Sequence, residues 1–300
     1  MSERPSPPRW LPFVVLGIGL VAISFGAILA RFAQGFGLPS LAIAALRLGL
    51  AALIVTPIAL WRSRRALLAM NRRQVWLTLG AGFFLALHFA TWISSLEYTS
   101  VASSTALVTT NLLWIGIVSF VLFGEKPSAL MALGIAISIS GSLMIFWSDS
   151  QHSAPGSNPL LGNLLALVGS WCFSAYLLIG RRLRANMPLP AYVWLAYGSA
   201  ALILLLACGG ASVSLAGYST PAYLAALGMA LGPQLLGHTS YNWSLKHVSP
   251  TFVAVVTLGE PVGSAVMAWI FFEESFALLQ GIGFVLLLTG IYIAARGERR

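Results

Sequence analysis

The sequence predicts an all-α membrane protein with ten transmembrane helices arranged as two inverted five-helix repeats. Three observations support this fold class. Of the 300 residues, 58% are hydrophobic and only 8% are charged, whereas about a quarter of the residues in soluble domains are charged. Apolar stretches of about 20 residues, the length that crosses a bilayer as a helix, recur along the whole chain. The two halves also resemble each other at a fixed spacing.

Ten apolar stretches are long enough to span a bilayer, and they leave no room for a separate soluble domain. Each is continuously apolar rather than alternating, so we expect helices, which satisfy their own backbone hydrogen bonds in lipid. The first stretch could also be read as a cleavable signal peptide, but removing it would break the symmetry between the halves. The predicted spans are residues 10–30, 39–61, 75–96, 101–123, 129–147, 160–180, 190–208, 222–243, 249–272 and 277–295.

The basic residues fall on alternate loops. If the N-terminus lies in the cytoplasm, all 17 lysines and arginines except Arg31 and Arg47 lie on the inner side. This asymmetry follows the positive-inside rule and places both termini in the cytoplasm. It also explains the net charge of +9, so we expect the lipid bilayer rather than nucleic acid as the partner of these charges.

A shift of 149 residues aligns the second part of each half without a gap, so that Leu96 overlies Leu245. Matched pairs include Ser100 with Ser249, Glu125 with Glu274, Gly134 with Gly283, and Gly141 with Gly290. Each half holds an odd number of spans, so the second half must insert upside down. The predicted repeats are residues 1–150 and 151–300, joined outside by the linker 148–159. Inverted repeats are frequent in secondary transporters, whose substrate site lies near the midplane.

Four stretches carry a resemblance to a known family: "LRLGLAALIVTPIALWR" in the second span, "FGEKPS" with the following "GIAISISG", "GSWCFSAYLLIGRR" in the sixth, and "GEPVGSAVMAWIFFEE" followed by "GIGFVLLLTGIY". On these residues the chain resembles the drug/metabolite transporter superfamily, in its bacterial ten-helix form with two EamA domains. Within it, the chain looks most like inner-membrane exporters of amino acids, including aromatic and neutral ones. The resemblance covers essentially the whole chain.

Glu260 stands beside Pro261 near the middle of the ninth span. An acid at the centre of a span costs about 2.5 to 3.5 kcal/mol on insertion scales, so its presence indicates function. Pro261 tends to kink the helix, and Gly259 lets other backbones approach closely. Glu260 could face a substrate cavity, or, protonated, bond a neighbouring helix and set the kink.

Polar stripes mark three further spans. Gln234, His238, Tyr241 and Asn242 share one face of the eighth span at helical spacing, and His88 and Trp92 share a face of the third, its repeat equivalent. Both histidines could instead be packing residues. In the fourth span Asn111 and Trp114 share a face, and Asn111 aligns with Glu260, which places the expected cavity between these spans.

Aromatic residues within spans complete the expected site, and one arginine also lies inside a span. The aromatic residues could form apolar pocket walls or belong to the interfacial belt. Arg47 could pair with Glu97, Glu260 or helix-end carbonyls, or snorkel to the surface. The inner aromatics are Trp92, Trp114, Trp171, Tyr176 and Tyr241.

These features predict a transporter that exports small organic solutes, most of all amino acids or related metabolites, by alternating access, as a monomer or weak homodimer. No metal or cofactor is implied, and no nucleotide-binding motif occurs. A carrier of drugs, other metabolites or phosphorylated sugars is an alternative within transport. An intramembrane enzyme is the alternative of another class, although the serines and histidines show no recognisable catalytic spacing.

Overall fold

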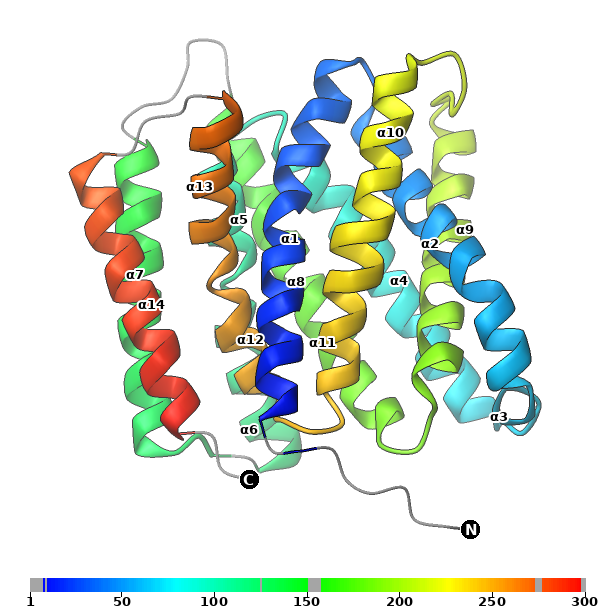
Figure 1. Ribbon diagram of the computed structural model, residues 1–300, viewed down its shortest axis with the longest axis horizontal. Coiled ribbons are helices and arrows are strands. Elements are labelled where there is room, and N and C mark those ends of the chain that lie inside the picture. The colour runs from blue at the N-terminus through cyan, green and yellow to red at the C-terminus, as the bar shows by residue number, and fades with distance from the viewer. Residues whose placement is uncertain (1–7, 9, 125, 151–157, 273–276, 298–300) are drawn as a thin grey trace.

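The computed structural model describes residues 8, 10–124, 126–150, 158–272 and 277–297. Within these residues the chain forms helices and no strand, which confirms the expected helical fold. The helices run back and forth between the two ends of one bundle (Figure 1). Six described segments are long and apolar enough to cross a membrane, judged by length and composition: Leu11–Gly35, Ser40–Arg62, Arg72–Ser95, Pro159–Arg184, Leu189–Gly210 and Pro250–Phe272.

Each predicted span contains one helix or several consecutive helices. The single helices are α1 (Leu11–Gly35), α2 (Ser40–Arg62), α4 (Arg72–Ser95), α7 (Ala129–Ser150), α8 (Pro159–Arg184), α9 (Leu189–Gly210) and α14 (Leu278–Gly297). The divided spans are α5 (Val101–Val108) with α6 (Asn111–Phe123), α10 (Thr220–Met229) with the π-helix η1 (Ala230–His238) and α11 (Thr239–Ser244), and α12 (Pro250–Thr257) with α13 (Glu260–Phe272). The short α3 (Arg64–Leu68) follows α2.

The fourth and ninth spans are broken at matching places. Helix α5 ends at Val108 and α6 begins at Asn111, while α12 ends at Thr257 and α13 begins at Glu260. A shift of 149 residues superimposes the two breaks residue for residue. The side chains of Ser100 and Ser249 cap α5 and α12 in the same way, each accepting a hydrogen bond from the backbone N–H three residues on.

The expectation that Pro261 kinks a continuous helix is wrong. Pro261 is the second residue of α13, where its missing N–H leaves no helical hydrogen bond unmade. The matching break at Thr109 and Thr110 has no proline beside it, so the break does not depend on one. Gly259 lies within the second break, and a β-carbon there would stand 2.7 Å from the Leu20 side chain of α1.

Helices α7 and α14 pack against each other at one edge of the bundle (Figure 1). A β-carbon on Gly134 would lie 2.5 Å from the Gly290 carbonyl oxygen, and one on Gly141 would lie 2.6 Å from the Gly283 carbonyl oxygen. In the 149-residue alignment, Gly290 is the counterpart of Gly141 and Gly283 is the counterpart of Gly134. Each of the two α7 glycines therefore contacts the counterpart of the other one. Ser138, midway between Gly134 and Gly141, donates a hydrogen bond of 3.3 Å to the carbonyl oxygen of Leu287, its own counterpart. A two-fold axis generates reciprocal contacts of this kind.

Basic residues gather at one end of the bundle. The connections from α2 to α4, α8 to α9 and α11 to α12 lie at the end where α1 begins and α14 ends (Figure 1). They carry Arg64, Arg65 and Lys246, with Arg184 and Arg296 near the adjacent helix ends. Most of the predicted linker, residues 151–157, lies outside the described residues, as do Glu125 and Glu274.

Candidate functional site

A buried cavity lies where the two broken spans meet. The side chains around it enclose about 370 Å³ of empty space when every gap between atoms and the adjoining solvent are counted. The continuous free space has room for about one water molecule, so the wall must move apart to admit a solute. Residues on both sides of each break line it. The lining residues are Ile23, Arg47, His88, Phe89, Trp92, Val108, Thr109, Asn111, Phe173, Pro233, His238, Tyr241, Thr257 and Glu260.

The cavity brings together about half of the predicted site residues, from five different helices. Six of them contribute to its wall, and each is less than a tenth exposed. Gln234, Tyr176 and Asn242 are buried beside the wall rather than in it, and Trp114 and Trp171 lie elsewhere. The six lining residues are His88, Trp92, Asn111, His238, Tyr241 and Glu260.

Asn111 and Glu260 occupy equivalent positions as the first residues of α6 and α13. The N-terminal end of a helix carries a partial positive charge, which favours a carboxylate there. Thr257 Oγ1 lies 3.5 Å from Asn111 Oδ1, long for a hydrogen bond, and Asn111 Nδ2 has no partner among the described residues. The two breaks therefore place a carboxyl group and an amide donor in one cavity.

Arg47 is the charged cavity residue that the sequence did not assign to the site, and uncharged wall residues such as Phe89 and Thr257 were also missed. It is 1% exposed, and its guanidinium carbon lies 3.9 Å from the centroid of the Phe89 ring. Its Nε donates a hydrogen bond of 2.8 Å to Gln234 Oε1. A charge well inside a span is itself a signal of function, but one sequence could not say which of its three possible partners it faces.

The structure distinguishes between the two acidic residues that were candidate partners of Arg47. Glu97 is occupied elsewhere, because its carboxylate accepts a hydrogen bond from the Ser40 hydroxyl. Glu260, in contrast, lines the same cavity as Arg47. Among the described residues, Arg47 and Glu260 form no direct ion pair, although their charges attract each other through space. The cavity thus lies between a guanidinium and a carboxyl group that do not touch.

Aromatic rings form much of the remaining wall. The His88 ring stacks on Phe173 at a centroid distance of 4.8 Å and lies nearly parallel to Trp92 at 6.1 Å. His88 Nδ1 lies 3.0 Å from the Gly169 carbonyl oxygen, and because a carbonyl only accepts, Nδ1 carries the hydrogen in this bond. His238 packs edge-on against Phe89 at 5.1 Å. Both histidines therefore sit inside an aromatic cluster.

The four polar residues predicted for one face of the eighth span are all buried in the bundle, but two of them do not line the cavity. Residues Ala230–His238 form a π-helix with Pro233 inside, and its wider turn shifts side chains away from α-helical spacing. His238 and Tyr241 line the cavity, whereas Gln234 lies outside its wall and accepts a hydrogen bond from Arg47 Nε. A π-bulge cannot be recognised from hydrophobic spacing.

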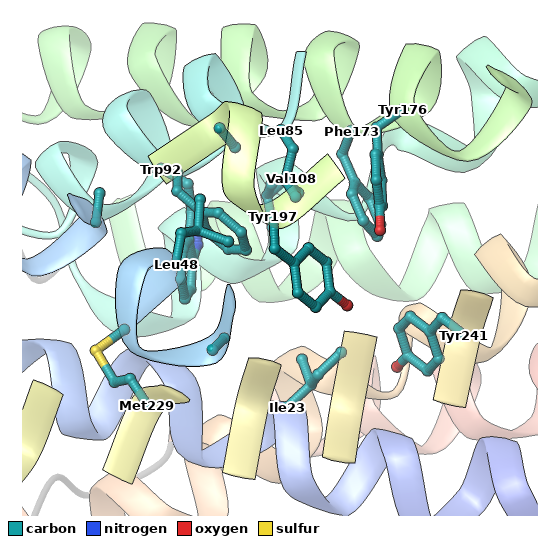
Figure 2. Packing of buried hydrophobic residues seen from close by; sticks show 14 of the residues in the cluster. Ile23, Leu48, Leu85, Trp92, Val108, Phe173, Tyr176, Tyr197, Met229 and Tyr241 are labelled. Carbon is teal, nitrogen blue, oxygen red and sulfur yellow. The ribbon is translucent and has the colours of Figure 1, made fainter. Parts of the chain in front are cut away.

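Asn242 and Tyr176 support the wall from outside. Asn242 Nδ2 donates to the hydroxyl oxygens of Tyr176 and Tyr197, the latter at 3.3 Å. The Tyr176 ring stacks on Phe173 with centroids 6.1 Å apart, and Figure 2 shows the two rings side by side. These residues fix the position of Phe173 without reaching the cavity.

Trp114 and Trp171 do not belong to the cavity, contrary to the prediction. Trp171 is 50% exposed and Trp114 is 37% exposed, and their rings meet edge to face with centroids 5.5 Å apart on the outside of α8 and α6. Helix α6 has few polar residues to mark an inner face, so the sequence could not show which way the Trp114 ring points; in α8 the buried Ser170 and Ser174 mark the inner face.

Comparison with known proteins gives one family. The model of the EamA-like transporter family matches residues 3–147 and again residues 160–296. The "Probable amino-acid metabolite efflux pump" of Escherichia coli (strain K12) is 25% identical over 315 aligned positions, which cover 100% of this chain and 97% of that protein. The "Uncharacterized transporter YyaM" of Bacillus subtilis (strain 168) is 24% identical over 273, covering 89% of this chain and 88% of that protein.

A solved crystal structure has the same fold. It superposes with a TM-score of 0.77 at 18% sequence identity, over 98% of this chain and 100% of the other chain. At this identity the likeness concerns the fold alone.

Proposed function

The chain belongs to the EamA-like transporter family, and on that premise we propose that it exports small organic solutes, amino acids first among them, across the bacterial inner membrane. The amino-acid class is supported by the likeness to the E. coli efflux pump, which extends over the whole of this chain. The proposed orientation has both termini in the cytoplasm, because the basic connections lie at the end where α1 begins.

We further propose that the protein is built from ten spans in two inverted repeats, residues 1–150 and 151–300. The reciprocal contacts of Gly134 and Gly141 across α7 and α14 support this arrangement, as do the matching breaks. A two-fold relation in the membrane plane would bring the fourth and ninth spans together at mid-depth, where transporters of this construction bind substrate.

The observation that carries the proposal is the coincidence of the two breaks with a buried, charged cavity. Interrupted helices in membranes occur where backbone lines a cavity rather than lipid. Each break frees its two half-helices to tilt separately, so that α5 and α13 can open one end while α6 and α12 close the other. Alternating access then follows without unfolding a helix.

Contacts of α13 with α1 support closure at the end opposite the basic connections. A β-carbon on Gly263 would lie 2.6 Å from Ser24 Cβ, and Ser264 Oγ donates to the Ser24 carbonyl oxygen at 3.1 Å. Small residues let the two helices touch there. We therefore expect the opening of this α1–α13 contact to release substrate outward.

Counterflow in sealed proteoliposomes tests the proposal. Vesicles loaded with one unlabelled solute from a panel of amino acids, amines, phosphorylated sugars and cationic drugs are diluted into the labelled solute, with and without a pH gradient. The proposal expects protein-dependent accumulation of neutral or aromatic amino acids. Accumulation of phosphorylated sugars alone would favour the rival carrier, and chemical conversion of a solute would favour an enzyme.

A further inference from the structure

Five buried polar atoms in the cavity wall have no partner among the described residues. Two of them, the Tyr241 hydroxyl and His238 Nδ1, can donate or accept, and the other three only donate. The three donors are Arg47 Nη1, Trp92 Nε1 and Asn111 Nδ2. Guanidinium, indole and amide nitrogens donate and do not accept, and a buried donor without a partner costs free energy. A ligand that brings acceptor oxygens would satisfy them.

Arg47 is fixed in place before any ligand arrives. Its Nε is bonded to Gln234 at 2.8 Å and its guanidinium plane rests over Phe89, so the unpartnered Nη1 need not move to meet a ligand. A guanidinium binds a planar carboxylate through paired N–H donors better than a lysine ammonium would. A carboxylate is therefore the acceptor that this side of the cavity fits.

Glu260 supplies the opposite chemistry. Its carboxylate lines the cavity from the first turn of α13 and forms no ion pair or hydrogen bond with another described side chain. A carboxylate only accepts, so its natural ligand is a donor with positive charge. An alkylammonium group has three such donors.

Charge balance then selects the ligand class. A ligand with only a carboxylate would place two negative charges, its own and that of Glu260, beside the one positive charge of Arg47. A ligand with only an amine would place two positive charges beside the one negative charge of Glu260. Uncompensated charge in a buried site is strongly unfavourable. A ligand that carries both charges keeps the cavity neutral and compensates each protein charge.

We propose that the cavity binds its substrate as a zwitterion, with the carboxylate held by Arg47 and the ammonium group by Glu260. This inference rests on the proposed transport function. When the wall opens to admit the substrate, His88 and Phe173 lie beside its side chain. Because this wall is largely aromatic, an uncharged apolar side chain fits it best.

Substrate analogues test the proposal without altering the protein. Wild-type proteoliposomes loaded with phenylalanine take up labelled phenylalanine in competition with phenylalanine amide, N-acetylphenylalanine or phenethylamine, and leucine serves as a second probe. We expect each analogue, which lacks one charge of the zwitterion, to compete at least about tenfold more weakly than phenylalanine, as the loss of a buried charge pair does elsewhere. Equal competition by an analogue would overturn the zwitterion assignment and leave the transport function intact.

Two variants test which protein residue binds which charged group of the substrate. Glu260→Gln should raise the competition by N-acetylphenylalanine relative to phenylalanine, because the ammonium partner is gone, and Arg47→Met should raise that of phenethylamine. A purely structural role would weaken every ligand alike and leave these ratios unchanged, which would overturn the assignment. If a variant does not fold, the wild-type analogue series decides. No counterflow of phenylalanine, leucine or other neutral amino acids would overturn both this inference and the amino-acid part of the proposed function.

Discussion

A single methyl group added to α14 should destabilise the protein by wedging two helices apart. In Gly290→Ala the new β-carbon would lie 2.5 Å from the Gly134 carbonyl oxygen and 2.6 Å from the Ser138 amide nitrogen. Ordinary contacts of a β-carbon begin at 3.4 Å, so α7 and α14 must separate by most of an ångström. Overpacking of this kind costs about 1 to 3 kcal/mol, and backbone atoms cannot rotate away as a side chain can.

Thermal unfolding of the detergent-solubilised protein measures this cost. The matched control is Gly281→Ala, in the same helix, where no atom lies within 4 Å of the added β-carbon. Because alanine favours a helix over glycine by about 1 kcal/mol, the control should melt at or above the wild-type temperature. Gly290→Ala should melt several degrees lower. Equal melting of the two variants would refute the packing of α7 on α14.

Three other predictions concern the site and the orientation. Glu260→Gln should lower amino-acid counterflow by at least about tenfold, and it should also lower the melting temperature because it leaves the buried Arg47 without a compensating charge; wild-type counterflow would exclude a role for the carboxylate. Trp171→Ala should leave the order of preferred substrates unchanged, whereas Phe173→Ala, two residues along and facing the cavity, should change it; the reverse pattern would put the site on the outside of α8. A reporter fused after residue 150 should be found outside the cytoplasm and one fused after residue 185 inside it. The opposite result would show that the predicted orientation in the membrane is reversed.

Features that depend on local composition were predictable from the sequence. Each predicted span coincides with helical residues because an apolar stretch in lipid has to close its own hydrogen bonds. The pairing of Asn111 with Glu260 followed from a simple alignment of the halves. Both residues do line one cavity, each as the first residue after a break in its span.

The sequence did not predict irregular backbone within a helix or the side of a helix to which an aromatic side chain points. The eighth span contains a π-helix around Pro233, and spacing alone does not reveal which of its buried polar residues line the cavity. Trp114 shows that an aromatic ring in an apolar helix carries no sign of the side it faces. Arg47 was visible as a charge in a span, yet its place depends on Gln234 and Phe89, which come from other helices and meet it only in the folded bundle.

The most direct test of alternating access is the accessibility of Thr257, which lies in the cavity wall and is 1% exposed. Thr257→Cys would be made in a background in which the two free cysteines, Cys172 and Cys208, are replaced by serine. A membrane-impermeant maleimide would then be applied to right-side-out and to inverted vesicles. Alternating access predicts labelling from both sides, slowed on each side by phenylalanine. Labelling from only one side, or from neither, with and without substrate would contradict a cavity that opens in turn to the two faces of the membrane.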